Sequence, residues 1–368
     1  MLLEKKKLAF DLKIFLAIIL LLILVGFIFI YSSSSVFALE KMGQASFFVR
    51  KQFLGFILGL FAIFITINLP LNFIKKFTPA FFLFSLLLTS LTLIPQFSLK
   101  IHGSNRWLSL GGIAFQPSEL IKIGLMMYTA YFLDKKLYKY GSFFKNFLPL
   151  LLILGITALI LLRQPDFGLT AALYVTIFSL LFIANYQIKY LILTVFMAFL
   201  GSIVLILYKP YRFKRVLTFL DPWKDPLGSG FQIIQSLIAI GSGNFWGVGI
   251  SNSRQKFFYL PMQHTDFIFS IIAEETGFLG SLLLILLFIL FLYFGLRIIL
   301  KLEDNFSLFA GLGFIILISL QALINFCVVT GLLPTKGVGL PFVSYGLSSL
   351  ICSMTMIGLI LNFVKNNS

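Results

Sequence analysis

Long apolar runs dominate the chain and alternate with short polar segments. A helix that crosses a bilayer needs about 20 predominantly apolar residues, and ten stretches approach that length. They fall at 13–33, 53–70, 77–95, 117–134, 146–162, 167–186, 189–208, 267–299, 306–330 and 345–364. Because the runs are continuous and do not alternate with a period of two, they exclude a membrane β-barrel. The pattern predicts an all-α polytopic integral membrane protein with about ten transmembrane helices.

These stretches form a single membrane domain, 1–368, interrupted by one long outer loop at about 209–266, between the seventh and the eighth span. A loop of this length inside a compact protein is usually functional. Within it, Ile234, Leu237 and Ile238 share one helical face, which predicts a short amphipathic or re-entrant helix over 231–240.

The composition supports the membrane assignment. Apolar residues make up 59% and charged residues 11%, with a mean hydropathy of +1.02; a soluble domain carries about 25% charged residues. Lys and Arg are about twice as frequent in the short loops on the side of the membrane that holds the N-terminus as in those on the opposite side. This bias predicts that both termini lie in the cytoplasm. Loop lysines account for much of the net charge of +16, so nucleic acid is not an expected partner, whereas an anionic lipid or a pyrophosphate substrate is.

Motifs for several reaction classes are absent. Cys327 and Cys352 lie in apolar stretches, and His102 and His264 are the only histidines, so no metal cluster is predicted. The sequence contains no P-loop, GxGxxG or HExxH motif. ATP hydrolysis, dinucleotide chemistry and zinc hydrolysis therefore have no support.

Ionisable residues inside apolar stretches are the strongest functional indicators, because each costs about 2.5–3.5 kcal/mol on insertion scales. Glu119 and Lys122 are spaced i, i+3 at the start of the fourth stretch, after Pro117, and share a helical face. Two interpretations stay open at this point. The pair either neutralises itself inside the bundle or forms the polar floor of a cavity open to the outer leaflet.

Asp266 ends the long loop in the sequence His264-Thr265-Asp266. It either caps the following helix or serves as a general base at the membrane–water boundary. A carboxylate with a pKa of about 4 is a weak base at neutral pH, which favours a positioning role over proton transfer. Glu274 and Glu275 follow deeper in the same span, where hydrogen bonds between helices are the expected role.

A basic cluster, 209–215, lies at the start of the long loop and includes Arg212 and Arg215. It contacts either anionic lipid or, given the geometry of the guanidinium group, the pyrophosphate of a lipid-linked substrate. Four further basic residues could add positive charge to the same outer face: Arg106, Arg254, Lys256 and Lys336.

Several longer motifs carry a resemblance to a known family. They are YSSSS (31–35), RWL (106–108), FQPSE (115–119), QPDFG (164–168), RVLTFLDPWKDPLGSGF (215–231), QKFFYLPMQHTDFIFSIIAEE (255–275) and GLLPTKGVGLPFVSYGLSS (331–349). Over nearly its whole length the chain resembles the SEDS proteins (shape, elongation, division, sporulation), and it is more similar to the FtsW cell-division branch than to RodA. One departure is Met262, where relatives often carry Glu.

The resemblance implies a peptidoglycan glycosyltransferase that polymerises lipid II at the outer face of the bacterial cytoplasmic membrane during septal wall synthesis, releasing undecaprenyl pyrophosphate. It implies that Asp266 is the essential catalytic residue and that Glu119 and Lys122 support it in the cavity. Together with the charge pattern, the resemblance implies that five basic residues bind phosphate oxygens: Arg106, Arg212, Arg215, Lys256 and Lys336.

The same resemblance implies several partners: lipid II, a glycan linked to undecaprenyl pyrophosphate, a class B penicillin-binding protein that supplies transpeptidase activity, other membrane proteins of the division machinery, and membrane lipids. A divalent cation, Mg²⁺ or Mn²⁺, is a weaker implication. Two other functions remain open from sequence alone: a lipid II flippase, and a non-catalytic division scaffold. Clustering of the ionisable residues towards the outer half argues against the flippase, which needs a polar route to both faces.

Overall fold

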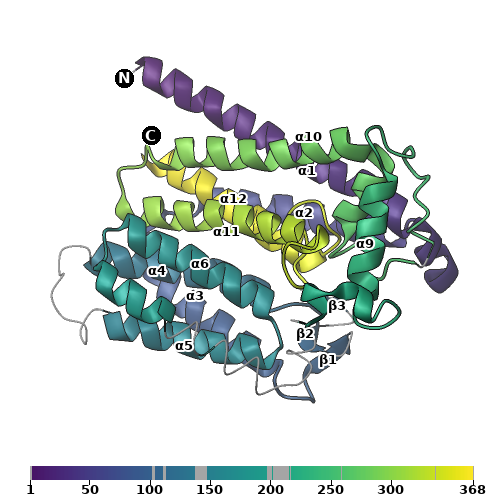
Figure 1. Cartoon of the computed structure of the whole chain (residues 1–368). Coiled ribbons are helices and arrows are strands. Elements are labelled where there is room, and N and C mark those ends of the chain that lie inside the picture. Colours follow the sequence, from purple (N-terminus) through teal and green to yellow (C-terminus); the bar gives the residue numbers. More distant parts are fainter. Residues whose placement is uncertain are drawn as a thin grey trace.

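The protein is a layered bundle of long helices (Figure 1). The computed structural model describes residues 2–101, 104–110, 113–136, 147–196, 201, 215, 217–257, 259–335 and 337–367. The helices are α1 (Leu2–Met42), α2 (Phe47–Asn68), α3 (Leu71–Leu91), α4 (Ser118–Lys136), α5 (Leu148–Arg163), α6 (Phe167–Ile183), α9 (Phe231–Ser242), α10 (Ile268–Ile299), α11 (Asn305–Val329) and α12 (Leu347–Asn367). A 3₁₀ turn, η2 (Pro222–Lys224), precedes α9.

The helices coincide with the predicted apolar stretches, which confirms the fold class. Six described helices are long and apolar enough to cross a membrane: α1, α2, α3, α10, α11 and α12. Helices α5 and α6 are shorter, and α4 carries Glu119, Lys122 and three further charges near its end. Of the predicted seventh span (189–208), 189–196 is helical and much of the rest lies outside the described residues. The protein is therefore an integral membrane protein.

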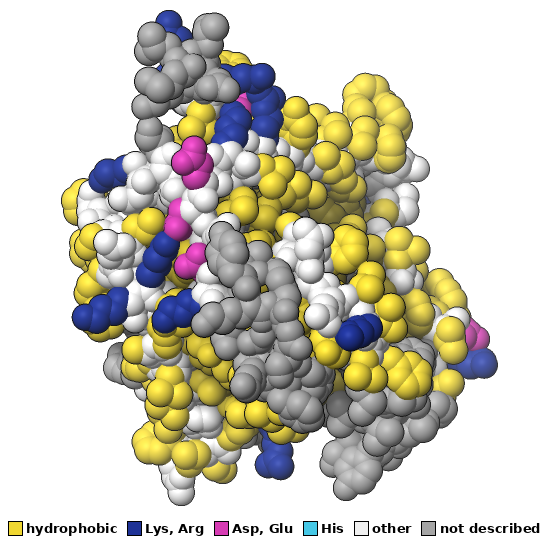
Figure 2. All heavy atoms as spheres, turned by 90° about the vertical axis from the view of Figure 1, so that its left-hand side faces the viewer, with side chains coloured by type: hydrophobic (Ala, Val, Ile, Leu, Met, Phe, Trp, Pro, Cys, Tyr) yellow, Lys and Arg dark blue, Asp and Glu magenta, His cyan; other side chains and the backbone are white. Residues whose placement is uncertain are grey.

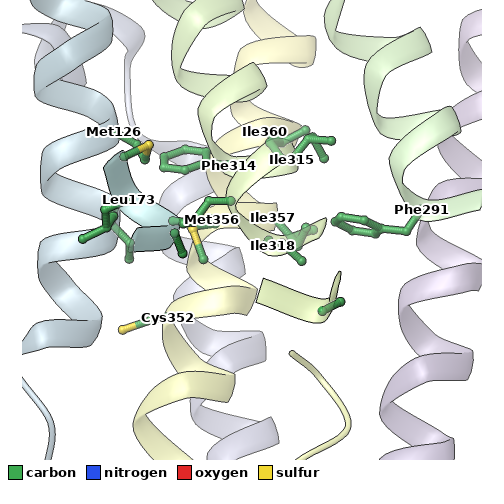
Figure 3. Close-up of a cluster of buried hydrophobic side chains, with 14 of the residues drawn as sticks. Met126, Leu173, Phe291, Phe314, Ile315, Ile318, Cys352, Met356, Ile357 and Ile360 are labelled. Atoms are coloured by element: carbon green, nitrogen blue, oxygen red, sulfur yellow. The ribbon is translucent and has the colours of Figure 1, made fainter. Parts of the chain in front are cut away.

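The core centres on α11. Phe314, Ile315 and Ile318 of this helix are fully buried, and they pack among side chains from four neighbouring helices (Figure 3). The neighbours drawn with them include Met126 of α4, Leu173 of α6, Phe291 of α10, and Met356, Ile357 and Ile360 of α12. Helices α2 and α3 instead leave most of their apolar side chains exposed, as a lipid-facing helix does.

Both chain termini lie at one end of the bundle (Figure 1). Figure 2 views this end and shows Lys, Arg, Asp and Glu side chains gathered among apolar ones. Asp11 of α1 is fully buried there, and one of its oxygens lies 3.1 Å from both Arg297 Nε and Lys301 Nζ. Lys75 pairs with Asp304 at the start of α11. These ion pairs tie α1 to the end of α10 and α3 to α11.

A small antiparallel sheet lies at the opposite end, beside α9 (Figure 1). Its strands are β1 (Ser98–Ile101), β2 (Ser104–Leu110) and β3 (Ile113–Phe115), in that order. Leu108 pairs with Ser98 on one side and with Phe115 on the other. The apolar pattern did not predict this sheet; it adds a short β element to an otherwise helical protein and carries Arg106.

The predicted short helix in the long loop is present as α9. Its buried face consists of Ile233, Ile234, Ser236 and Ala239, whereas Ile238 is 43% exposed. The predicted face was therefore wrong by part of a turn. The reason is polar: Ser236 Oγ lies 2.8 Å from Ser270 Oγ of α10 and donates to Val329 O of α11 at 2.6 Å, which fixes the rotation of α9.

Helix α10 is interrupted at Gly277, whose φ of 67° and ψ of −160° are accessible to glycine alone. The interruption lets the segment after α9 bond to the helix backbone: Val248 N–H donates to Glu274 O at 3.0 Å, and Phe278 N–H donates to Asn244 O at 2.9 Å. The segment 244–249 is thereby fixed against the N-terminal part of α10.

Candidate active site

Arg106 of β2 joins the sheet to the turn between α5 and α6. Its Nε donates to Gln164 O and its Nη2 to Pro165 O, both at 2.8 Å, while its Nη1 lies 3.5 Å from Asp166 Oδ2. The Gln164 amide in turn donates to Thr89 O of α3 at 3.0 Å. The guanidinium is therefore held in one orientation by three groups on a buried turn.

Asp266 lies in the irregular segment just before α10, and its neighbours are fixed by the segment that precedes α12. Ser344 Oγ donates to Thr265 O at 2.6 Å, and Tyr345 N–H donates to His264 O at 2.9 Å. The N-cap position of α10 is Phe267, and no side chain caps the helix there. The capping interpretation of Asp266 is therefore not supported.

Gly337 brings a third segment to the same place. A Cβ added to Gly337 would lie 3.1 Å from Asp266 Oδ2 and 3.8 Å from Arg106 Nη1. The carboxylate of Asp266 thus faces a backbone that has no side chain, with the arginine of β2 beside it. Residues from three distant parts of the chain meet at this point, which lies at the sheet end of the bundle.

We expect Gly337→Ala to reduce activity because the added methyl group would contact the Asp266 carboxylate more closely than nine in ten real Cβ contacts. A displacement of about 1 Å can cost about 100-fold in rate, and the carboxylate here must move by a few tenths of an ångström, so we expect a smaller loss than that. The measurement is the rate at which the purified variant polymerises lipid II, the activity that the family resemblance implies. Gly241→Ala is the matched control, because nothing lies within 4 Å of its added Cβ; equal rates for the two variants would show that this contact is unimportant.

Burial raises the pKa of Asp266 to about 6; the positive charge of Arg106 lowers it and the negative charge of Asp166 raises it further. Burial also raises the pKa of Asp166, against the lowering effect of Arg106 and of the Leu169 backbone N–H. Asp266 is thus a much stronger base than the sequence indicated, while still being mostly ionised at neutral pH. Proton transfer becomes as feasible as positioning.

Glu119 and Lys122 form an ion pair on α4, with Lys122 Nζ 2.5 Å from Glu119 Oε2 and side chains 10% and 1% exposed. Both charges act on the pKa of Asp166. The geometry is that of a buried, self-neutralising pair, and it also lies within electrostatic range of the Arg106–Asp166 contact. The supporting role predicted for both residues stays a prediction.

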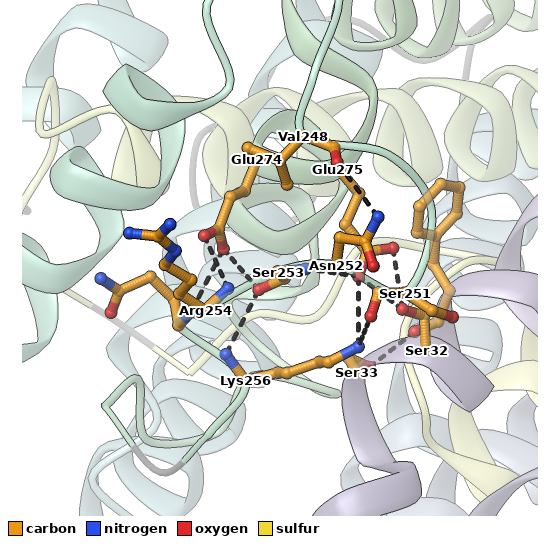
Figure 4. Close-up of polar contacts among 12 residues, drawn as sticks. Ser32, Ser33, Val248, Ser251, Asn252, Ser253, Arg254, Lys256, Glu274 and Glu275 are labelled. Atoms are coloured by element: carbon orange, nitrogen blue, oxygen red, sulfur yellow. Dashed lines mark hydrogen bonds and ion pairs between the residues drawn. The ribbon is translucent and has the colours of Figure 1, made fainter.

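Lys256 occupies a different environment from the one predicted. It is 4% exposed, its Nζ donates to Ser251 O, and it lies 3.8 Å from Glu275 Oε1. Ser32 of α1 donates to both oxygens of Glu275, at 2.6 and 2.7 Å. Figure 4 shows this buried network between α1, α10 and the loop. The predicted pyrophosphate contact does not fit a lysine whose charge is already neutralised there.

Glu275 confirms the expected hydrogen bond between helices, since its partner Ser32 belongs to α1. Glu274 turns instead towards the loop, where Arg254 N–H donates to its Oε1 at 2.8 Å and Ser253 Oγ donates to its Oε2. The two carboxylates therefore hold the segment 251–256 in place (Figure 4).

Of the other basic residues predicted at the site, Arg215 is exposed and lines a pocket of about 130 Å³ between η2, α9 and the segment after α11. Thr218, Ile233, Gly331 and Thr335 line the same pocket. Arg212 and Lys336 lie outside the described residues. Thr335 is two residues from Gly337, so the pocket and the Asp266 carboxylate share one chain segment.

The described part of the chain brings no three His, Cys, Asp or Glu side chains together as a cation site. Arg106 supplies positive charge beside both Asp166 and Asp266, and Lys122 adds to it at Asp166. The residues present therefore do not fit a cation held by protein ligands, and we derive no step through one.

Asp166 was not predicted as a site residue, although it belongs to the QPDFG motif at 164–168. The signal was available: an aspartate stands directly before an apolar run, where its side chain also accepts from Leu169 N–H at 3.3 Å and caps α6. Its contact with Arg106, some 60 positions away, had no local signature.

Comparison with known proteins decides the family. The profile of the FtsW/RodA/SpoVE family, described as "Cell cycle protein", matches residues 12–368. The chain belongs to this family. It is 41% identical to a probable peptidoglycan glycosyltransferase FtsW of Geobacter sp. (strain M18), covering 92% of each chain, and 40% identical to the stage V sporulation protein E of Bacillus subtilis (strain 168), covering 94% of each.

Solved structures agree with the FtsW/RodA/SpoVE assignment. One is a chain of a peptidoglycan synthase complex described as coordinating polymerization and crosslinking; it is 31% identical, with a TM-score of 0.78 over 96% of this chain and 97% of that one. Another is the rod shape determining protein RodA of Thermus thermophilus, 24% identical, with a TM-score of 0.70 over 96% of each chain, which supports the fold alone.

Proposed function

We propose that this protein is a peptidoglycan glycosyltransferase that polymerises lipid II into glycan strands and releases undecaprenyl pyrophosphate. The observation that carries the proposal is the Asp266 carboxylate, which sits beside Arg106 and the bare backbone of Gly337 with a pKa of about 6. A buried base next to a fixed cation suits a reaction in which a hydroxyl loses a proton while a diphosphate departs. Relatives that are about 40% identical carry the same activity in their names.

In the proposed reaction, a sugar hydroxyl of one lipid-linked substrate attacks the anomeric carbon of the other. Asp266 accepts the hydroxyl proton as the new C–O bond forms. The bond between the anomeric carbon and the diphosphate oxygen breaks, and the diphosphate leaves with the electron pair. Arg106 keeps Asp266 largely ionised and offsets negative charge at the diphosphate, with Arg215 at the neighbouring pocket. Mg²⁺ or Mn²⁺ bound by substrate phosphates would add to that charge compensation.

The arrangement of the chain supports a location for this reaction. We propose that both termini face the cytoplasm, so that the sheet end with Asp266 lies at the outer face of the membrane. We further propose that the protein acts at the division septum with a class B penicillin-binding protein, which would cross-link the strands, together with other membrane proteins of the division machinery. The similarity to a chain of a synthase complex supports an assembly of this kind.

The test is polymerisation of fluorescent lipid II by the purified chain together with its class B partner, in liposomes, with the transpeptidase blocked by a β-lactam. Long glycan strands support the proposal. If no strands form while a control polymerase makes them, the proposal fails and lipid translocation becomes the next assay.

The pH dependence of polymerisation should report Asp266. Its base form is required, so we expect the rate to fall about tenfold per pH unit below about pH 6. Arg106→Gln removes the charge that lowers this pKa. The acidic limb of the pH profile, where the rate falls with falling pH, should therefore move to higher pH. Arg254→Gln, at an exposed position, should leave the limb in place. A limb that stays put in Arg106→Gln would contradict the assignment.

A further inference from the structure

Asn325 is a buried polar side chain in α11, the helix on which the core centres. It lies near the end of α11 and is 1% exposed. Its Nδ2 donates to Asp266 O at 2.8 Å and to Val338 O at 2.7 Å. A carbonyl oxygen can only accept, so two carbonyls at these distances require the NH₂ group of the amide to face them, each taking one of its two hydrogens.

The two carbonyls belong to the two chain segments that enclose the candidate base. One is the carbonyl of Asp266 itself. The other is that of Val338, the residue next to Gly337, whose bare backbone faces the Asp266 carboxylate. One amide therefore sets the separation between the segment that carries the carboxylate and the segment that faces it.

We propose that Asn325 is a positioning residue for the transfer reaction, which clamps the Asp266 segment and the 337–338 segment at the spacing that the Asp266 carboxylate needs. The proposal rests on the proposed function. It assigns Asn325 no contact with substrate: the amide acts through the two backbones. Without it, the segments lose the link that is made at Asp266 itself, water enters beside the carboxylate, and the base loses its fixed position.

One other described side chain links the two stretches. Ser344 Oγ accepts from Leu340 N–H at 2.7 Å and donates to Thr265 O at 2.6 Å, so its link lies beyond Val338 in one segment and before Asp266 in the other. Asn325 alone, among the described side chains, donates to the backbone of both Asp266 and Val338. Its loss should therefore be felt at the carboxylate more than in the bundle as a whole.

The chain offers a matched control in Asn362 of α12. This side chain is fully buried, and its Nδ2 contacts Thr66 O at 2.9 Å and Leu69 O at 2.6 Å. It also contacts Ile67 O at 3.1 Å, so the same chemistry ties α12 to the turn between α2 and α3, at the end of the bundle remote from Asp266. A purely structural effect of losing such an amide should appear equally in both variants.

The experiment compares Asn325→Leu with Asn362→Leu in the complex with the class B partner, using lipid II polymerisation and thermal unfolding. Leucine keeps the volume and removes both donors. We expect kcat to fall about 100-fold in Asn325→Leu, with KM within about twofold, because the substrate contacts remain. Asn362→Leu should lower the unfolding temperature by about as much as Asn325→Leu does, and it should leave kcat within about twofold of the wild type.

The pH profile gives a second readout that a structural role would not change. Burial is the main cause of the raised pKa of Asp266. Separating the two segments exposes the carboxylate and lowers this pKa, so the loss of rate on acidification should occur at a lower pH than in the wild type. The charged groups that act on Asp266, Arg106 and Asp166, are unchanged in this variant, and His264 stays in the same turn. Asn325→Ser, which keeps one donor, should show a smaller shift and a smaller loss of kcat, and it serves if the leucine variant does not fold.

Three results would overturn the proposal: an unchanged kcat in Asn325→Leu or Asn325→Ser, a loss equal to that of Asn362→Leu, or a rise in KM with kcat unchanged. Polymerisation by the wild-type complex in the same assay reports on the proposed function separately.

Discussion

Asp266→Asn should abolish growth-supporting activity while leaving the protein folded and assembled. The substitution keeps the size of the side chain but removes the base, and general base catalysis contributes about 10²–10⁴-fold to rates. The amide also no longer pairs electrostatically with Arg106. We expect no complementation in cells depleted of the native protein, with normal protein level and normal binding to the class B partner.

Asp221→Asn is the control for this prediction. Asp221 lies in the same long loop, but its side chain is 44% exposed and pairs only with the exposed Lys224 among described residues, so its loss should have no effect on growth. The result also separates a scaffold from the two active functions, glycosyltransferase and flippase. Growth supported by Asp266→Asn at a normal protein level would indicate a scaffold, because a scaffold needs partner binding and no base.

Lys122→Met should destabilise the protein strongly. Lys122 is 1% exposed and its Nζ lies 2.5 Å from Glu119, so the substitution leaves a buried carboxylate without its partner. Breaking a buried pair from one side costs about 3–5 kcal/mol. The measurement is thermal unfolding of the purified protein in detergent, where we expect a large drop in unfolding temperature together with a low yield.

The double variant, Glu119→Gln with Lys122→Met, should recover most of the lost stability, since it removes both charges together. Lys224→Met is the control: its ion pair with Asp221 is exposed, and such pairs contribute about 0–1 kcal/mol. If Lys122→Met were no more destabilising than Lys224→Met, the pair would not be buried in the way described. A stable but inactive double variant would assign the pair a role in the reaction.

The helical fold follows from the sequence because each helix buries or exposes an uninterrupted apolar run. Continuous runs without alternation admit one secondary structure in a bilayer, since every backbone group must bond within its own segment. The sheet at 98–115 was not predicted because its strands are three to seven residues long and mix Ser, Asn and Arg with apolar residues. Short strands of this kind have no periodicity to detect.

The site could be predicted only where a residue is unusual in its own surroundings. Asp266, Glu119 and Lys122 stand out because charges are rare in or beside apolar runs. The contact of Arg106 with Asp166 and the approach of Gly337 to Asp266 depend on how distant segments pack. Lys256 shows the opposite error: a basic residue in an outer loop indicated a phosphate contact, but folding buries it against Glu275.

The pKa of Asp266 also lay beyond the sequence. An exposed aspartate is a weak base, and burial, together with the nearby negative charge of Asp166, raises the pKa of Asp266 to about 6. The same burial brings Arg106 close enough to keep the carboxylate mostly ionised at neutral pH. The chemistry of the residue was therefore predictable from its type and place in the chain, but its strength as a base was not.

The most direct test of the central claim is a side-by-side polymerisation assay of wild-type protein and Asp266→Asn. Each is purified with the class B partner, reconstituted in liposomes with fluorescent lipid II, and treated with a β-lactam to block transpeptidation. We predict long glycan strands from the wild type and none from Asp266→Asn, at equal folding and equal partner binding. Equal polymerisation by both proteins would contradict the account.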